Sequence, residues 1–378
     1  MNVPGLRIRF TDAERAEIAK RVETCLTTGQ IAQGRNVGEL EDAMAGLVGT
    51  RHAVAVSSGG TAIQATMRAL DVRGKTVLAP DNTFLATVAG VLHEGGRVRL
   101  VDSAPSAAFP SLDDYRAAFE KHSAGSADSK VSGVVVVHIG GLIPADIEDI
   151  AAWCEAEGLW LFEDCAHAHG SHRGDTPAGR FGVAGAYSFF ATKVVTSGEG
   201  GMVVTDDDAL AHSVRMHRDY GKGSQWVTYN EAVGCNWRMG ELSAAIGVVH
   251  LRALEAMQSR RTEITALYRE RLEDSPLELV LPDHPASGYK VIALLPAGVD
   301  RSELKASLKE RGVGLPGGVY DLALHQQPAL EGRDDVDFDG DYPHAADFAA
   351  RHVCLPVYPS LTDDEALFAA DQLAAALA

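Results

Sequence analysis

The sequence lacks the patterns that would place the chain in a membrane or in a disulfide scaffold. None of its apolar runs approaches the ~20 residues that a membrane-spanning helix needs, and residues 1–10 contain no apolar signal core. The five cysteines are scattered and none forms a Cys-x-x-Cys pair, which favours reduced thiols and gives no zinc or iron–sulfur motif. We therefore expect a cytoplasmic globular protein.

Basic residues are also scarce. Lys and Arg number 34 against 52 Asp and Glu, which gives a formal net charge of −18. This excess of negative charge argues against binding a nucleic-acid backbone or an anionic membrane through bulk electrostatics. An anionic substrate would have to be held by a local cationic pocket. With 378 residues, 46% of them apolar, the chain is long enough to bury a large core, in two domains or in one large domain with a lobe.

Short apolar runs alternate with helical patterns along most of the chain. The run at residues 131–138 is nearly all valine, as in a strand buried on both faces of a parallel sheet, and residues 61–70 and 145–157 have helical character. This alternation predicts an α/β protein whose three-layer large domain has a mostly parallel sheet. We assign this domain to residues 1–250 and a small C-terminal α/β domain to residues 251–378.

Two predicted strands end in chemically useful side chains. The run at residues 159–162 leads into Asp164, and the run at residues 186–190 leads to Lys193. In open α/β sheets, ligands bind at the carboxyl ends of strands. Pyridoxal phosphate needs an amine to form a Schiff base with its aldehyde and a carboxylate to keep its pyridine nitrogen protonated. Lys193 and Asp164 are therefore the candidate catalytic residues.

Two further segments follow predicted strands. The backbone N–H groups of Gly60, Thr61 and Ala62 would point out of the N-terminus of a helix, ready for a phosphate. The same small residues also suit a plain strand-to-helix turn. Phe84 could stack on a cofactor ring, or it could be an ordinary core aromatic.

A metal site is the main alternative chemistry. Asp164, His167 and His169 have side chains that suit zinc or iron and would support a metal-dependent hydrolase. No companion Glu or Cys motif completes a ligand set, so we expect no metal and interpret His169 as a structural hydrogen-bonding residue. A non-catalytic binding or regulatory protein is a third possibility, against which the presence of Lys193 argues.

Six segments, in the same order along the chain, resemble those of the DegT/StrS-type sugar aminotransferases, which are fold-type I pyridoxal-phosphate enzymes. The resemblance covers nearly the whole chain. The segments are residues 58–62 (Ser-Gly-Gly-Thr-Ala), 80–87 (Pro-Asp-Asn-Thr-Phe-Leu-Ala-Thr), 163–170 (Glu-Asp-Cys-Ala-His-Ala-His-Gly), 188–193 (Ser-Phe-Phe-Ala-Thr-Lys), 198–201 (Gly-Glu-Gly-Gly) and 236–239 (Asn-Trp-Arg-Met).

The resemblance implies roles for individual residues around the cofactor. It gives Gly60, Thr61 and Ser188 to the cofactor phosphate. It places His167 at the phenolic oxygen and Phe84 against the ring.

The resemblance also implies a homodimer with shared active sites. Asn236 would reach the phosphate of the neighbouring subunit's cofactor. Cys235 stands where the family often has Tyr, which leaves the packing there open. The loop at residues 315–327 resembles the family's substrate loop, so His325 and Tyr320 are candidate substrate contacts.

The implied function is an aminotransferase that moves an amino group, from L-glutamate, onto a nucleotide-linked keto sugar in nucleotide-sugar or natural-product biosynthesis. Lys193 would act first as the amine that holds the cofactor and then as general acid and base. The residues expected to bind the cofactor do not indicate which acceptor substrate the enzyme uses. A carbocyclic keto substrate, or an aminobenzoate-forming relative, remains an alternative.

Overall fold

The computed structural model of the chain describes residues 1–105, 107–125, 130–223, 229–338 and 340–377. The α-helices are α1 (Asp12–Thr28), α2 (Arg35–Val48), α3 (Gly59–Ala69), α4 (Leu85–His93), α5 (Leu112–Gly125), α6 (Ile147–Glu157), α7 (Asp208–His217), α8 (Glu241–Arg252), α9 (Leu254–Arg271), α10 (Arg301–Glu310), α11 (Pro343–Arg351) and α12 (Asp363–Leu377). The strands are β1 (His52–Val56), β2 (Thr76–Pro80), β3 (Arg97–Val101), β4 (Val131–Val137), β5 (Trp160–Asp164), β6 (His172–Arg173), β7 (Thr176–Pro177), β8 (Ala184–Ser188), β9 (Gly201–Thr205), β10 (Glu278–Val280), β11 (Val291–Leu294), β12 (Val336–Asp337) and β13 (His352–Leu355). Short 3₁₀ helices are η1 (Ile139–Gly141), η2 (Leu324–Gln326) and η3 (Pro328–Leu330).

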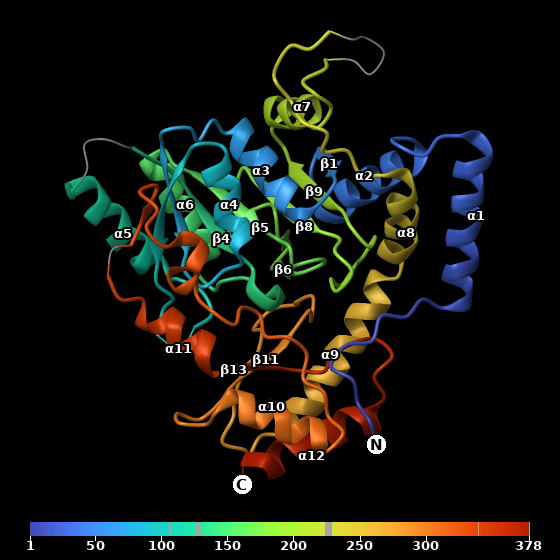
Figure 1. Cartoon of the computed structure of the whole chain (residues 1–378), viewed down its shortest axis with the longest axis vertical. Helices are drawn as coiled ribbons and strands as arrows, with labels where there is room; N and C mark the ends of the chain where they lie inside the picture. Colours follow the sequence, from blue (N-terminus) through green and yellow to red (C-terminus); the bar gives the residue numbers. More distant parts are fainter. Residues whose placement is uncertain (106, 126–129, 224–228, 339, 378) are drawn as a thin grey trace.

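An eight-stranded sheet forms the middle layer of the larger part of the molecule. Its strand order is β1-β9-β8-β5-β4-β2-β3-β12 (Figure 1). Strand β9 runs antiparallel to both of its neighbours, and the other adjacent pairs are parallel. The predicted fold class, a large α/β part with a mostly parallel sheet, is confirmed.

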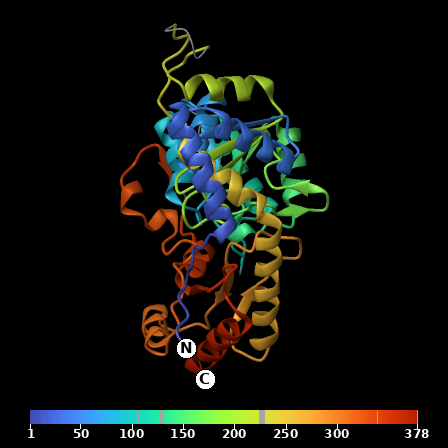
Figure 2. The ribbon, with the colours of Figure 1, turned by 90° about the vertical axis from the view of Figure 1, so that its right-hand side faces the viewer.

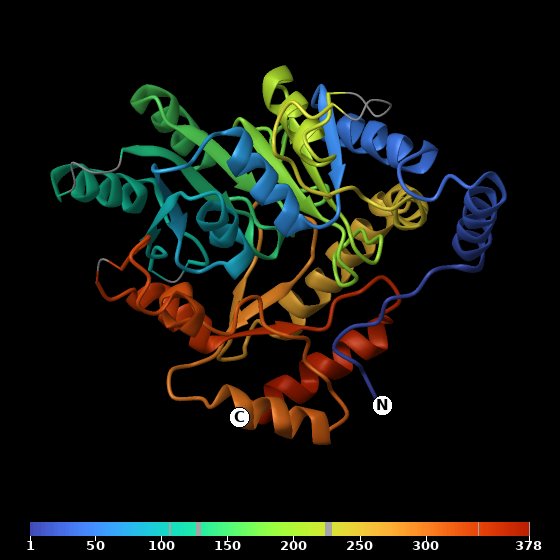
Figure 3. The ribbon, with the colours of Figure 1, turned by 45° about the horizontal axis from the view of Figure 1, so that its top comes forward.

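Helices cover both faces of this sheet, which makes the three layers visible in Figure 3. In strand β1, successive side chains pack into the cores on opposite faces of the sheet. Val54 and Val56 join the core under α3, α4 and α7, whereas Ala53 and Ala55 join the core under α2 and α6. This alternation follows from the two-residue period of a strand.

The smaller part of the molecule has its own core. It contains the antiparallel sheet β10-β11-β13, packed with α9, α10 and α12. Helix α9 leads into it from α8, and the two views in Figures 1 and 2 show this long path. The two helices are separated at Ala253, where α8 ends and α9 begins. No helix in the described ranges is long and apolar enough to cross a membrane.

The domain boundary itself stays a proposal. Residue 250 lies inside α8, two residues before that helix ends. Two short pairings link segments distant in sequence. Val3 pairs with Val313 of the smaller part, and β12 pairs with β3 of the large sheet.

One edge of the sheet carries the ends of several parallel strands. Because β1, β2, β4, β5 and β8 run in the same direction, their carboxyl ends meet along one edge. The residues that end β5 and β8 are Asp164 and Ser188.

Candidate active site

Asp164 ends β5 at the carboxyl edge of the sheet, and only 5% of the residue is exposed. Its Oδ2 accepts a hydrogen bond from the Thr87 hydroxyl at 2.8 Å, and its Oδ1 accepts one from the Ala166 N–H at 3.1 Å. Burial raises the pKa of Asp164, whereas these donors and the positive charge of Lys193 lower it. The carboxyl group is therefore a buried acceptor held at both oxygens.

Lys193 follows β8 at the same edge. Its Nζ lies 4.9 Å from the centroid of the Tyr289 ring, so the amine faces an aromatic ring. Burial lowers the pKa of Lys193 to about 8, while the nearby Asp164 charge raises it. The amine and the carboxylate that were predicted to act together thus lie close enough for each to influence the pKa of the other.

His167 is a neutral ring in this site. Its Nδ1 accepts the N–H of Gly140 at 3.2 Å, and its ring stacks on Tyr289 with the centroids 4.4 Å apart. Burial, together with the charge of Lys193, lowers the pKa of His167 well below its usual range. Since Nδ1 accepts a hydrogen bond, the neutral ring carries its proton on Nε2. His167 can therefore offer a donor at Nε2.

The glycine turn before α3 packs directly against the end of β8. A Cβ placed on Gly59 would lie 2.7 Å from the Cβ of Ser188, so the close approach depends on glycine at this position. The approach brings Gly60, Thr61 and Ser188, which the sequence assigned to a phosphate, to one place.

The N–H groups of this turn are less free than the sequence analysis expected, which is a correction. Ser58 is the N-cap of α3, and its side chain accepts the N–H of Thr61 at 3.1 Å while its carbonyl accepts the N–H of Ala62 at 3.0 Å. Of the three N–H groups predicted to face a phosphate, that of Gly60 is the one without an acceptor in the described ranges. The Thr61 hydroxyl lies 3.1 Å from Ser57 Oγ.

Phe84 and Asn236 both expose their side chains. Phe84 is the N-cap residue of α4 and is 63% exposed, so it is not a core aromatic. Asn236 is also exposed, and its backbone bridges Asp219. The next residue, Trp237, accepts the N–H of Ser57 at 2.8 Å, which places this segment beside the glycine turn. The role of Asn236 across a dimer interface stays a prediction.

The two candidate substrate residues are tied to the same edge. The N–H and Nδ1 of His325 contact the two carboxyl oxygens of Asp81 at 2.8 and 2.6 Å. Asp81 follows β2 and is fully buried, and burial raises its pKa. Tyr320, in the same loop, is stacked on His167 with the ring centroids 6.1 Å apart. Substrate contact by His325 and Tyr320 remains a prediction.

His169 does not have the role predicted for it. Neither ring nitrogen has a hydrogen-bond partner among the described residues, and the ring packs between Tyr187 and Phe189 with centroids 5.1 and 5.2 Å away. Burial lowers the pKa of His169 to about 3. The side chain is therefore a neutral packing group rather than a hydrogen-bonding one.

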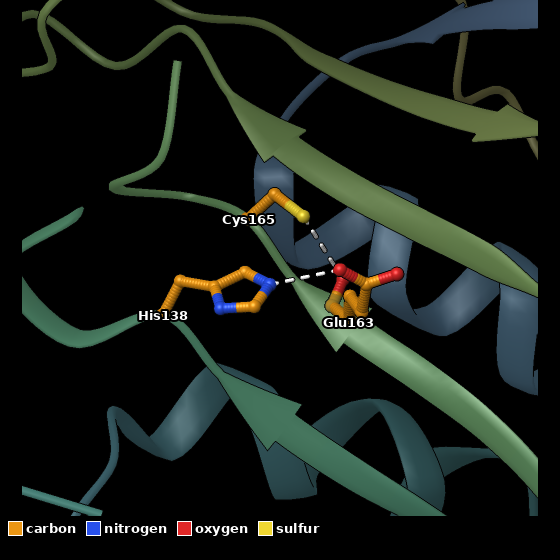
Figure 4. A group of neighbouring side chains, drawn as sticks. All are labelled: His138, Glu163 and Cys165. Atoms are coloured by element: carbon orange, nitrogen blue, oxygen red, sulfur yellow. Dashed lines mark hydrogen bonds and ion pairs between the residues drawn. The ribbon is translucent and has the colours of Figure 1, made fainter. Parts of the chain in front are cut away.

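The three side chains considered for the metal-site alternative do not form a ligand group. In the described part of the chain, one group of three possible ligands has its atoms within 4.8 Å of one another, and it consists of His138, Glu163 and Cys165 (Figure 4). That group does not include the set predicted for the hydrolase alternative, which was Asp164, His167 and His169.

Hydrogen bonding explains the group in Figure 4 without a metal. Glu163 accepts bonds from His138 Nε2 at 2.9 Å, from the Gly179 N–H at 2.7 Å and from the Gly182 N–H at 2.8 Å. Burial raises the pKa of Cys165, which disfavours the thiolate that a metal would need. Glu163 therefore fastens the loop before β8 to β5.

Two further cations lie near Tyr289. Lys290 Nζ is 5.2 Å from the ring centroid and donates to the Gly317 carbonyl at 3.0 Å. Arg261 is 4% exposed and donates to two backbone carbonyls at 3.1 and 2.9 Å. Neither forms an ion pair with an acid in the described ranges, and burial lowers the pKa of both. Together with Lys193, they give this region local positive charge in a chain whose net charge is −18.

Sequence reasoning missed Tyr289 and Thr87. Tyr289 precedes a strand of the smaller part, and no local pattern connects it with Lys193. Thr87 had a weak signal, because Thr83 and Thr87 are four residues apart at the start of a helix that follows a strand end.

Comparison with known proteins gives a consistent picture. Residues 12–373 match the family model of the DegT/DnrJ/EryC1/StrS aminotransferases. The spore coat polysaccharide biosynthesis protein SpsC of Bacillus subtilis (strain 168) is 31% identical over 371 residues, which cover 93% of this chain and 92% of SpsC. DesI, solved in the presence of its TDP-sugar product, superposes with a TM-score of 0.87 and is 29% identical, covering 99% of this chain and 92% of DesI. DesV of S. venezuelae gives a TM-score of 0.88 at 28% identity, covering 99% and 98% of the two chains.

Proposed function

The chain belongs to the DegT/DnrJ/EryC1/StrS aminotransferase family and is an aminotransferase, and we propose that it transfers an amino group from L-glutamate to a nucleotide-linked keto sugar with pyridoxal phosphate as cofactor. The observation that carries the proposal is the meeting of Lys193 and Asp164 at one edge of the sheet in a chain of this family. The TDP-sugar product of DesI and the polysaccharide pathway of SpsC support a sugar as the acceptor.

The residues at this edge fit the proposed cofactor. When bound, pyridoxal phosphate supplies an aldehyde that condenses with amines and a protonated ring that withdraws electrons. A half-buried amine, a buried carboxylate, an exposed aromatic ring and a helix N-terminus with an unused N–H are all present. The residues that would hold the cofactor are Lys193, Asp164, His167, Phe84, Ser188, Gly60 and Thr61.

Lys193 is suited to move a proton. An amine with a pKa of about 8 is neutral in about one molecule in ten at pH 7, which is far more than an ordinary lysine provides. A neutral Nζ can act as a nucleophile and can take a proton from one atom and return it to another. The Tyr289 ring beneath it orients the amine.

Asp164 and His167 hold protons in fixed places. An ionised Asp164 would keep a proton on the ring nitrogen of the cofactor. His167, with its proton on Nε2, would donate to the phenolic oxygen.

Lys290 and Arg261 support an anionic substrate. Both proposed substrates carry negative charge, as the carboxylates of the donor and the phosphates of the acceptor. Because the two cations have no acidic partner in the described ranges, a bound anion would neutralise them without breaking an ion pair.

A direct test locates the cofactor. Borohydride reduction of the holoprotein, followed by peptide mapping, should place the phosphopyridoxyl group on Lys193. A label on another lysine would refute the assignment. Nucleotide-linked keto sugars should then be screened with L-glutamate by measuring 2-oxoglutarate, and activity with a carbocyclic ketone alone would refute the sugar acceptor.

We also propose a homodimer in which Asn236 serves the cofactor phosphate of the neighbouring subunit. In a mixed dimer of Lys193→Ala and Asn236→Ala chains, one site combines an intact lysine with an intact asparagine and the other lacks both. If Asn236→Ala alone loses cofactor retention, co-refolding should restore activity at limiting cofactor. Hybrid dimers that form but stay inactive would assign Asn236 to its own subunit.

A further inference from the structure

A chain of buried hydroxyl groups leads to Asp164. Thr83 Oγ1 lies 2.8 Å from Thr87 Oγ1, and Thr87 Oγ1 lies 2.8 Å from Asp164 Oδ2. Thr83 is 1% exposed and Thr87 is fully buried. Two hydroxyl groups therefore stand in series behind one carboxyl group.

Helix α4 produces this arrangement. Phe84 is its N-cap residue, so Thr87 lies in the first turn and faces Thr83, four residues earlier. The N–H of Thr83 is bonded to the carbonyl of Asp81 at 3.1 Å, which holds Thr83 at the end of β2. Both threonines are thus fixed by backbone structure.

The carboxylate fixes the direction of every bond in the chain. An ionised carboxylate can only accept hydrogen bonds, so the single proton of the Thr87 hydroxyl points to Asp164. The Thr87 oxygen must then accept the proton of Thr83. Each donor polarises the next, which strengthens the bond to the carboxylate.

We propose that Thr87 is a positioning residue that, with Thr83 behind it, keeps the Asp164 carboxylate ionised and in place. Asp164 needs such help because burial works against its charge. The only other hydrogen bond to its carboxyl group among the described residues comes from the backbone N–H of Ala166. The value of this device for a cofactor rests on the proposed function, but its effect on the protonation of Asp164 does not.

Other groups also act on Asp164 and must be held constant. The titratable side chains that interact with it electrostatically are Lys193, His138, Cys165 and Tyr320. A substitution at Thr87 changes none of these charges. A shift in the protonation of Asp164 in such a variant would therefore report the hydroxyl itself.

The test compares four substitutions in the full-length apoprotein. Thr87→Val removes the hydroxyl and keeps the shape, Thr87→Ser keeps the hydroxyl, and Thr83→Val removes only the second link. The matched control is Thr66→Val, because Thr66 is fully buried and its hydroxyl donates to the Ala62 carbonyl of its own helix at 2.9 Å. The infrared carboxyl band that disappears in Asp164→Asn gives the protonation of Asp164 as a function of pH.

We expect Thr87→Val to raise the pH midpoint of this band by about 1 to 2, because a hydrogen bond to a charged group changes an equilibrium roughly 10- to 100-fold. Thr83→Val should give a smaller rise in the same direction. Thr87→Ser and Thr66→Val should match the wild type. An unchanged midpoint in Thr87→Val would overturn the proposal, and if that variant does not fold, an unchanged midpoint in Thr83→Val would do so.

A second measurement separates this proposal from the proposed function. In Thr87→Val, the dissociation constant of pyridoxal phosphate should rise, and the size of this rise should depend on pH. In Thr87→Ser, the dissociation constant should return to the wild-type value. A wild-type protein that does not bind pyridoxal phosphate would refute the proposed function. The infrared result would still decide the role of Thr87.

Discussion

Raising the pH of the apoprotein should convert Lys193 from ammonium to neutral amine near pH 8, more than two pH units below an ordinary lysine. The cause is burial beside the Tyr289 ring, which disfavours the charged form more than Asp164 favours it. With a pKa of about 8, the neutral fraction rises about fivefold between pH 7 and pH 8 and only about twofold more above it. A solvent-exposed lysine would instead gain about tenfold per pH unit through pH 9.

The assay is brief acylation of the apoprotein with an uncharged amine reagent between pH 6 and pH 11, followed by mass spectrometry of the Lys193 peptide. The pH midpoint is independent of how easily the reagent reaches the site. Exposed lysines in the same digest serve as internal standards. Asp164→Asn should lower the midpoint of Lys193, because it removes an attractive charge. A rate that climbs through pH 10, or a midpoint that Asp164→Asn raises, would refute the reasoning.

The same shift has a consequence for stability. The difference between 10.5 and about 8 corresponds to about 3 kcal/mol, which the folded apoprotein loses by holding a charged Lys193 below pH 8. Between pH 8 and pH 10.5 the unfolded chain binds more protons than the folded chain at this site, so this cost disappears as the pH rises. Lys193→Met should therefore stabilise the apoprotein at pH 7 and have a much smaller effect at pH 10.5.

Three other outcomes follow from the site. Asp164→Asn should still bind the cofactor but lose about 100-fold or more in turnover, since a neutral amide cannot hold the ring nitrogen protonated, and near-normal turnover would exclude this role. Asp81→Asn should raise the KM for the keto acceptor about tenfold and change the half-reaction with L-glutamate little, because Asp81 fixes His325 and not Lys193. Equal losses in both half-reactions would contradict a role of His325 in binding the acceptor. A thiol reagent at pH 8 should label the half-buried Cys235 before Cys154 and Cys354. Burial raises the thiol pKa to about 12 in Cys154 and to about 11 in Cys354, so both stay protonated at this pH. Early labelling of either would contradict their burial.

The sequence was sufficient for most of the fold because local and tertiary preferences agree. The valine run at residues 131–138 became β4, a strand in the middle of the sheet, and the capping box at Thr11 starts α1. Two-residue β12 was not predictable, because its pairing with β3 depends on tertiary contact rather than on any local pattern.

The site was predictable where chemistry sits at strand ends and unpredictable where it depends on packing. Asp164 and Lys193 could be found because each lies within three residues of the end of an apolar run. Tyr289 could not, since its position beside Lys193 is set by how the smaller part packs on the large sheet. The use of Ser58 as a helix cap also required geometry, because the same serine could have left the N–H of Thr61 free. His169 shows the reverse error, in which a polar side chain near the site turned out to be packing.

The adjacent acids Glu163 and Asp164 give β5 both a structural and a catalytic role at this edge of the sheet. Successive residues of a strand point to opposite faces, so the two carboxyl groups separate although they are neighbours in sequence. Glu163 accepts the N–H groups of Gly179 and Gly182, which fixes the loop that leads into β8. The end of β8 sets the position of Lys193, five residues after Ser188. Glu163, which lies outside the site, therefore positions Lys193. Asp164, which lies in the site, raises the pKa of Lys193.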